Sequence, residues 1–218
     1  MYIPAPFAES DLDTLHAFMA AHPLATVVTS SPAHGLSATP VPLFVDRAAG
    51  RYGRLEGHVA RANPHVGRVR DGDDALVVFT GPDAYITPAW YPSKQAHGKV
   101  VPTWNYIAVH ATGVLRLHDD HAFLLAHLDR LTGAHEASQA HPWAVADAPS
   151  SYIEQLVAAT VGFTIEITQL EGKYKLSQNR PGADIDGVVH GLRHAATARE
   201  RELAEQVARR KPTRESAC

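Results

Sequence analysis

Short stretches in which hydrophobic and polar residues alternate run through the first two thirds of the chain, and this pattern predicts strands. A longer stretch, with Trp104, Tyr106 and Ala108 on one face and Asn105 and Ile107 on the other, is the longest strand candidate. Turn residues such as Gly81-Pro82-Asp83 separate the stretches. The strands are predicted at residues 24–29, 36–45, 52–57, 75–80, 84–87, 101–117 and 161–170.

Helical spacing of leucines and other apolar residues predicts helices between these strands. A first helix follows the cap residues Ser10-Asp11 and extends to His22. Another begins at Asn63-Pro64, where Asn is a favoured N-cap and Pro fits the first helical position. Further helices are predicted at residues 122–131, 150–159 and 188–211, the last one broken near Gly191.

Six or seven strands in hairpin-like succession, with helices inserted between them, favour an antiparallel barrel over a doubly wound parallel sheet. We therefore predict an α+β fold, a mostly antiparallel β-barrel with peripheral helices. One domain is expected over residues 1–192, followed by a basic C-terminal helix or tail over residues 193–218.

Composition narrows the class of protein. The 218 residues suffice for a sizeable core, and a net charge of −3 gives no general attraction to nucleic acid or anionic membranes. The single cysteine, Cys218, excludes an intramolecular disulfide. We see no signal peptide and no apolar run long enough to cross a membrane, so a cytoplasmic protein is expected.

The basic residues after Leu192 have two interpretations. Arg and Lys outnumber Glu between Arg193 and Arg214, which is compatible with contact to nucleic acid. A solvated amphipathic helix explains the same residues better, because a recognition surface normally has a wider basic field.

The stretch from Gly57 to Pro64 is a candidate anion site. The start of the predicted helix would offer unpaired N–H groups, and His58 and Arg61 would add cationic donors for a phosphate. Gly57 would let the backbone approach a ligand closely. A capped helix with two solvated basic side chains is the competing interpretation.

Three clusters of aromatic and polar residues are candidates for ligand binding. They occupy residues 90–94, 101–110 and 172–179, and their aromatic faces and amides suit a planar heteroaromatic ligand. Core aromatics with polar strand ends would give the same pattern. The 14 histidines are scattered without metal-ligand spacing, so no metal site is predicted, and the chain lacks a GxGxxG or Walker A motif.

Four blocks of the sequence resemble the PaiB family, described as FMN-binding negative transcriptional regulators. The resemblance extends in order from residue 1 to about residue 192. The blocks are Met1-Tyr-Ile-Pro4 with Phe7, Gly57-His-Val-Ala-Arg-Ala-Asn-Pro64, Val101-Pro-Thr-Trp-Asn-Tyr106 with Val109-His110, and Glu171-Gly-Lys-Tyr-Lys-Leu-Ser-Gln-Asn179.

The resemblance implies the FMN-binding split barrel of pyridoxamine-phosphate oxidases and flavin reductases, with FMN as cofactor. It also implies a homodimer whose flavin lies between the subunits, with the flavin phosphate at the turn from His58 to Asn63. The implied cofactor-binding residues are His58, Val59, Ala60, Arg61 and Asn63 at the phosphate, Trp104, Asn105 and Tyr106 along the ring, and Lys175, Ser177, Gln178 and Asn179 closing the groove.

Three functions are compatible with this resemblance. Negative regulation of transcription follows from the family, with DNA contacted by the basic tail or a dimer surface, or with an indirect effect through a regulatory partner. A flavin-dependent oxidoreductase follows from the related barrels. A haem-binding or haem-degrading protein on the same barrel is the third possibility.

Overall fold

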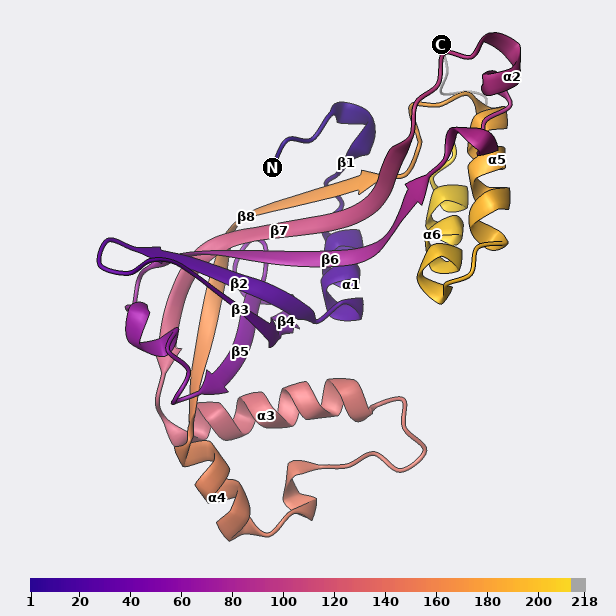
Figure 1. The fold of residues 1–218 in the computed structure, drawn as a ribbon. Coiled ribbons are helices and arrows are strands. Elements are labelled where there is room, and N and C mark those ends of the chain that lie inside the picture. Colours follow the sequence, from indigo (N-terminus) through magenta and orange to yellow (C-terminus); the bar gives the residue numbers. More distant parts are fainter. Residues whose placement is uncertain (213–218) are drawn as a thin grey trace. The chain divides into compact units, whose positions relative to one another are not determined.

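The computed structural model describes residues 1–212; Cys218 and the end of the basic tail lie outside the described residues. Its strands form one sheet in the order β3-β2-β6-β7-β8-β5-β4, with β1 paired to β8 (Figure 1). The β1–β8, β2–β3, β2–β6, β4–β5 and β5–β8 pairings are antiparallel, which confirms the predicted sheet type. The strands are β1 (Ala8–Glu9), β2 (Leu24–Ser31), β3 (Gly35–Pro42), β4 (Phe44–Asp46), β5 (Arg54–Ala60), β6 (Asp74–Ile86), β7 (Thr103–His118) and β8 (Thr160–Lys175).

The described α-helices precede β2, connect later strands or follow β8 in the chain. None of them is both long and apolar enough to cross a membrane. They are α1 (Leu12–Ala21), α2 (Ser93–His97), α3 (His121–Glu136), α4 (Ser150–Ala158), α5 (Gly182–Arg193) and α6 (Ala198–Arg209).

The chain divides into two compact units, and the strands β6, β7 and β8 each contribute residues to both. Unit 1 comprises Met1–Asp11, Thr80–Val109 and the chain from Glu171 onward. Unit 2 comprises Leu12–Phe79 and His110–Leu170.

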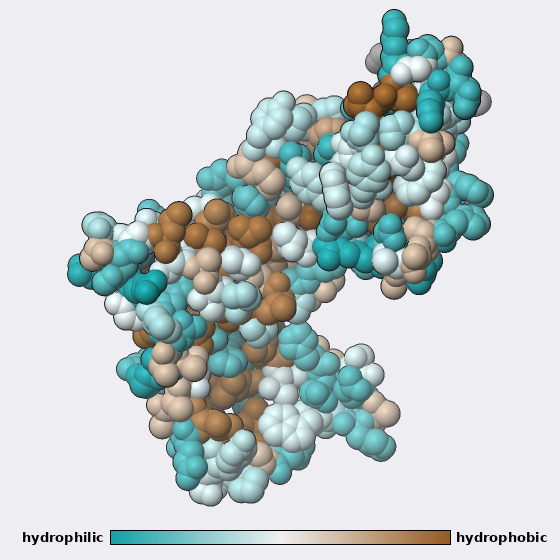
Figure 2. Space-filling view, in the orientation of Figure 1, coloured by the Kyte–Doolittle hydropathy of each residue, from teal (hydrophilic) through white to brown (hydrophobic). Residues whose placement is uncertain are grey.

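Unit 2 is built on the hairpin of β2 and β3, in which Val27 lies opposite Thr39. Every second residue of β2 is buried, as the alternating pattern predicts for a sheet with one face inward. The core of this unit contains Val27, Val77, Phe79, Leu115 and Ile165 from the strands, with Leu15 and Met19 from α1 and Leu124 from α3. Figure 2 shows hydrophobic residues gathered over the strands around β2.

Unit 1 contains α5 and α6, which pack side by side (Figure 1). Their facing sides are apolar, with Val188 and Leu192 of α5 and Leu203 and Val207 of α6 all fully buried. The alternation predicted for the first half of β7 is confirmed, because Asn105 and Ile107 are buried while Trp104 is exposed.

Two of the element boundaries predicted from the sequence are wrong. The Gly81-Pro82-Asp83 turn does not form; these residues lie inside β6, where Pro82 removes only one possible hydrogen-bond donor from a long strand. The helix expected after Asn63-Pro64 is a 3-10 turn, Val66–Arg68, whose N-cap is His65 without a side-chain capping bond. Ahead of this turn, Oδ1 of Asn63 accepts a hydrogen bond from the backbone N–H of His65 (2.9 Å).

The predicted helical break near Gly191 is also displaced. Gly191 lies inside α5, and a Cβ there would lie 2.3 Å from the ring of Trp90, so the missing side chain makes room for that indole. The chain leaves the helical conformation after Arg193, and α6 begins with a capping box formed by Thr197 and Glu200.

Gly57 has a packing role in place of the ligand approach expected from the sequence. A Cβ at this position would lie 2.5 Å from Cζ of Phe163 and 2.7 Å from Cδ2 of Leu43, both in the core of unit 2. The absent side chain therefore lets β5 and β8 enclose these two hydrophobic residues.

We expect Gly57→Ala to lower the free energy of unfolding by about 1–3 kcal/mol, since overpacking displaces Phe163 or Leu43. Urea unfolding measures the change. Gly67→Ala is the matched control, because nothing lies within 4 Å of a Cβ built at Gly67. Equal stability of both variants would contradict the packing role of Gly57.

Candidate functional site

The ends of β7 and β8 bring together the residues predicted to line a flavin ring. Asn105 donates a hydrogen bond from Nδ2 to Oγ of Ser177 at 2.9 Å, and both side chains are buried in unit 1. Ser177 has a left-handed backbone with φ of 66°, so its chain turns sharply just after β8. The bond to Asn105 ties this turn to β7 and so brings the sequence blocks 101–110 and 171–179 together in space.

Gln178 completes the same turn through its side-chain amide. Its Oε1 accepts a hydrogen bond from the backbone N–H of Leu176 (2.7 Å), and its Nε2 donates to the carbonyl of Tyr174 (2.6 Å). Asn179, the next residue, is exposed. Gln178 therefore holds the turn in shape, and its contact with a ligand stays a prediction.

An aromatic groove runs along the exposed face of β7. The Trp104 side chain is 53% exposed and packs edge-to-face against Tyr85, with ring centroids 6.2 Å apart. Apolar atoms dominate the groove, as in sites that bind flat organic ligands. The groove is lined by Thr80, Gly81, Asp83, Trp104, Tyr106, Ile107 and Ala108.

Two lysines of β8 approach Tyr106 beside this groove. Nζ of Lys173 lies 5.3 Å, and Nζ of Lys175 lies 6.0 Å, from the centre of the Tyr106 ring. Lys175 also donates a hydrogen bond to Oγ1 of Thr103 (2.6 Å). Burial lowers the pKa of Lys175; Tyr106 opposes this effect, and the charges of Lys173 and Arg180 add to it. Aromatic faces and cations thus meet at one place in unit 1.

The second group of predicted residues, from His58 to Asn63, lies in unit 2, and its contact with a ligand stays a prediction. Arg61 uses its guanidinium within the chain: it pairs with Asp119 and donates to the carbonyls of Ala158 (3.1 Å) and Thr160 (2.9 Å). This pairing lowers the pKa of Asp119. Because Arg61 already has these partners, it fastens the end of β5 to the start of β8.

Val59 and Ala60 occupy the end of β5, opposite Val161 and Thr160 of β8. Val59 and His65 both line a small apolar cavity. The His65 ring lies between Oγ1 of Thr29 and Oγ1 of Thr39, each at 2.7 Å. These contacts are part of the packing of unit 2.

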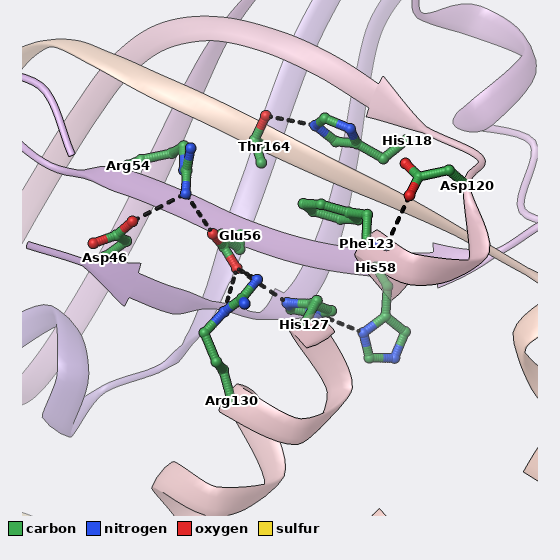
Figure 3. A network of polar contacts seen from close by, with 10 residues as sticks. All are labelled: Asp46, Arg54, Glu56, His58, His118, Asp120, Phe123, His127, Arg130 and Thr164. Carbon is green, nitrogen blue, oxygen red and sulfur yellow. Dashed lines mark hydrogen bonds and ion pairs between the residues drawn. The ribbon is translucent and has the colours of Figure 1, made fainter. Parts of the chain in front are cut away.

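His58 belongs to a buried polar network that the sequence analysis did not find (Figure 3). Its Nδ1 lies 3.0 Å from Nε2 of His127 on α3, and Nδ1 of His127 faces Oε2 of Glu56 at 3.7 Å. Burial and the nearby His127 lower the pKa of His58. Contact of His58 with a phosphate stays a prediction.

Glu56 is the centre of this network, and its side chain is only 1% exposed. Arg130 donates to Oε2 at 2.6 Å, and Arg54 donates to Oε1 at 3.0 Å while also pairing with Asp46 (Figure 3). Burial alone would raise the pKa of Glu56, but the nearby His127, the hydrogen bond from Arg130 and the charges of Arg130 and Arg54 outweigh it, and the pKa falls to about 2. His127 and Arg130 are three residues apart on α3, a spacing that could have indicated their common face.

Among residues 1–212, no group of three or more histidine, cysteine, aspartate or glutamate side chains could hold a metal ion.

Comparison with known proteins shows to which family the chain belongs. The family described as "Putative FMN-binding domain" matches residues 1–169. An uncharacterized protein of Emericella nidulans is 33% identical over 90% of this chain and 92% of its own length. The protease synthase and sporulation protein PAI 2 of Bacillus subtilis is 30% identical over 94% of this chain and 95% of its own length.

The solved structure of the FAD and haem binding protein from Mycobacterium smegmatis has the same fold, with a TM-score of 0.55 at 20% identity, covering 77% of this chain and 73% of that chain. The fold and the family match define an FMN-binding split-barrel protein, whose sheet is not closed. The chain belongs to the PaiB-type family of FMN-binding proteins, and FMN is its cofactor.

We expect Glu56→Gln to lower the free energy of unfolding by about 1–3 kcal/mol at pH 7, because Arg54 and Arg130 lose the carboxylate that they share. The loss is limited because both guanidinium groups are partly exposed and can bind water. The Glu56 pKa is lowered from 4.5 to about 2 in the folded chain, so its ionised form stabilises the fold above pH 4.5. This contribution is lost as the pH falls through the folded value.

The difference in unfolding free energy between wild type and Glu56→Gln should therefore shrink as the pH is lowered from 7 toward the folded pKa of about 2. Denaturant unfolding at several pH values measures it. Glu154→Gln is the control, since Glu154 is 60% exposed and pairs with His121 at the surface. A pH-independent difference would contradict the assigned role of Glu56.

Proposed function

We propose that the aromatic groove of β7 binds the isoalloxazine ring of FMN and that the protein acts as a PaiB-type negative regulator of transcription. The observation that carries the binding proposal is the exposed Trp104 indole beside Tyr106 and two lysines. An indole that is 53% exposed loses contact with water when a flat ring covers it, and stacking adds to this gain. FMN supplies electron transfer when it is bound.

The other residues of the site have distinct tasks in this proposal. Trp104 and Tyr106 present flat faces along β7. Asn105 and Ser177 bond to each other in the interior, so they fix the distance between β7 and the turn after β8. Gln178 shapes that turn. Asn105, Ser177 and Gln178 therefore position the exposed residues that contact the flavin.

We also propose a C2 homodimer with two equivalent flavin sites. The family-derived residues fall into two groups, one in each unit, and a second copy of the chain offers a way to join them. In this arrangement, the stretch from His58 to Asn63 of one chain borders the groove that contains Trp104 of its partner.

Regulation through the basic segment itself is disfavoured by the ion pairs of α6. Arg193 pairs with Glu205, Arg199 with Asp83, and Lys211 with Asp186. Arg201 donates to the carbonyls of Ala195 and Ala196. Because these cations have partners within unit 1, the proposed regulation acts without DNA contact by α6.

A flavin-dependent oxidoreductase is the second candidate function. The observation that favours it is the exposure of the groove, since a ring lying on Trp104 would keep one face accessible to a reductant or acceptor. Oxidation of NAD(P)H by the FMN-loaded protein would support this candidate. Retardation of a promoter fragment in a gel would support direct regulation.

We expect Trp104→Ala to weaken FMN binding by roughly threefold to tenfold, the range for loss of one aromatic contact. Quenching of flavin fluorescence during titration measures the affinity. Trp143→Ala is the matched control, because Trp143 is similarly exposed, at 44%, but lies in unit 2. Unchanged affinity in Trp104→Ala would place the ring elsewhere.

The homodimer has a separate test. We expect sedimentation equilibrium to give twice the chain mass of 23.6 kDa, with one FMN bound per chain. A monomer that binds FMN with full affinity would contradict the composite site while leaving FMN binding itself intact.

A further inference from the structure

The second half of β6 presents an acidic side chain to the aromatic groove. Gly81 and Pro82 are both buried, so the alternation of β6 shifts by one residue there, and Asp83 and Tyr85 follow on the same, more exposed face. Tyr85 packs against Trp104 of β7, and Asp83 lines the groove itself. Among the described residues that line the groove, Asp83 is the one carboxylate. Its side chain is 35% exposed, so a ligand in the groove can reach it.

Arg199, the second residue of α6, brings a positive charge to the same place. Its Nη2 donates to the carbonyl of Gly81 (2.9 Å) and pairs with Oδ2 of Asp83. Both partners line the groove, and all three residues belong to unit 1. A guanidinium carries five N–H donors, and these two bonds use only those on Nη2. The donors on Nη1 and Nε of Arg199, and Oδ1 of Asp83, have no hydrogen-bond partner within residues 1–212.

The attachment of α6 does not depend on this ion pair. The helix is held by its buried side chains Leu203, Ala204 and Val207. Arg199, in contrast, is 56% exposed, and ion pairs at such exposure contribute about 0–1 kcal/mol to folding. The position of the pair beside the groove is therefore a better guide to its role than its effect on stability.

The imide edge of an isoalloxazine ring is complementary to this pair. That edge has one donor, the N–H at position 3, between the carbonyl oxygens at positions 2 and 4. A free carboxylate oxygen of Asp83 accepts from the N–H, and the free donors of Arg199 bind a neighbouring carbonyl. A ring that lies on Trp104 directs this edge toward β6, because β6 is the strand next to β7 on the side of Asp83.

We propose that Asp83 and Arg199 bind the imide edge of the isoalloxazine ring and that Arg199 favours the reduced flavin. The proposal rests on the proposed FMN binding in the groove and goes beyond it by assigning the residues that orient the ring and set its redox balance. Two-electron reduction with uptake of one proton at N5 leaves one negative charge over N1 and the carbonyl at position 2. The positive charge of Arg199 stabilises this form, and the negative charge of Asp83 opposes it.

The test measures how much more tightly the protein binds reduced FMN than oxidised FMN. The midpoint potential of bound FMN, obtained with dithionite as reductant in the absence of oxygen and compared with that of free FMN, gives this affinity ratio. We expect Arg199→Met to lower the ratio about threefold or more, because a partly exposed positive charge is lost. Asp83→Asn should raise the ratio, because it keeps an acceptor oxygen and loses the negative charge. Disturbed packing would move both variants in the same direction.

Two further variants serve as comparisons. Arg199→Lys should keep most of the wild-type ratio because it keeps the positive charge. Arg201→Met is the matched control, since Arg201 is an exposed arginine of α6 that donates to the carbonyls of Ala195 and Ala196. Its ratio should equal that of the wild type. Circular dichroism shows whether each variant is folded, and Arg199→Gln replaces Arg199→Met if that variant is not.

The outcomes separate this assignment from the proposed function. An unchanged ratio in a folded Arg199→Met, Arg199→Gln or Asp83→Asn would overturn the assignment with FMN binding intact. Shifts of the two charge variants in the same direction, or an equal shift in Arg201→Met, would overturn it as well. A wild type that binds neither form of FMN would overturn the proposed function, and the assignment with it.

Discussion

Compensation of buried charge is the constraint on which both units of this protein depend. In unit 2 the chain meets it with its own residues: Glu56 accepts from Arg54 and Arg130, and His127 faces its second oxygen. A carboxylate in that position would otherwise be strongly destabilising. The network around Glu56 thereby holds α3 on β5. In unit 1, Glu9 pairs with Arg210 and Glu171 binds the amino group of Met1.

The elements of the fold could be predicted well wherever the pattern of apolar residues is long and regular. β7 and β8 have one buried residue in every two over much of their length, and the leucines of α3 have helical spacing. The errors occurred where a local signal competed with packing. Gly81-Pro82 has turn composition but lies inside β6, and Gly191 lies inside α5, where its missing side chain leaves room for Trp90.

The candidate site was only partly predictable, for a related reason. The block from Trp104 to Tyr106 and the block from Lys175 to Asn179 could be linked only by resemblance to a family, and the structure joins them through the bond between Asn105 and Ser177. The sequence could not show that Arg61 has a partner in Asp119, 58 residues away, or that His58 lies against His127 of α3. Local chemistry suggested cations, and tertiary contacts determined which of them keep an unpaired charge.

The basic C-terminal segment shows most directly that tertiary contacts determine the partners of the cations. By composition, the arginines after Leu192 are the most prominent cations of the chain, and they suggest a surface for nucleic acid. In the structure Arg199 pairs with Asp83 and Arg210 with Glu9, at sequence separations of 116 and 201 residues that no local pattern reveals. The charges of the last helix thus serve the fold, because their partners are acids on distant elements of the described chain.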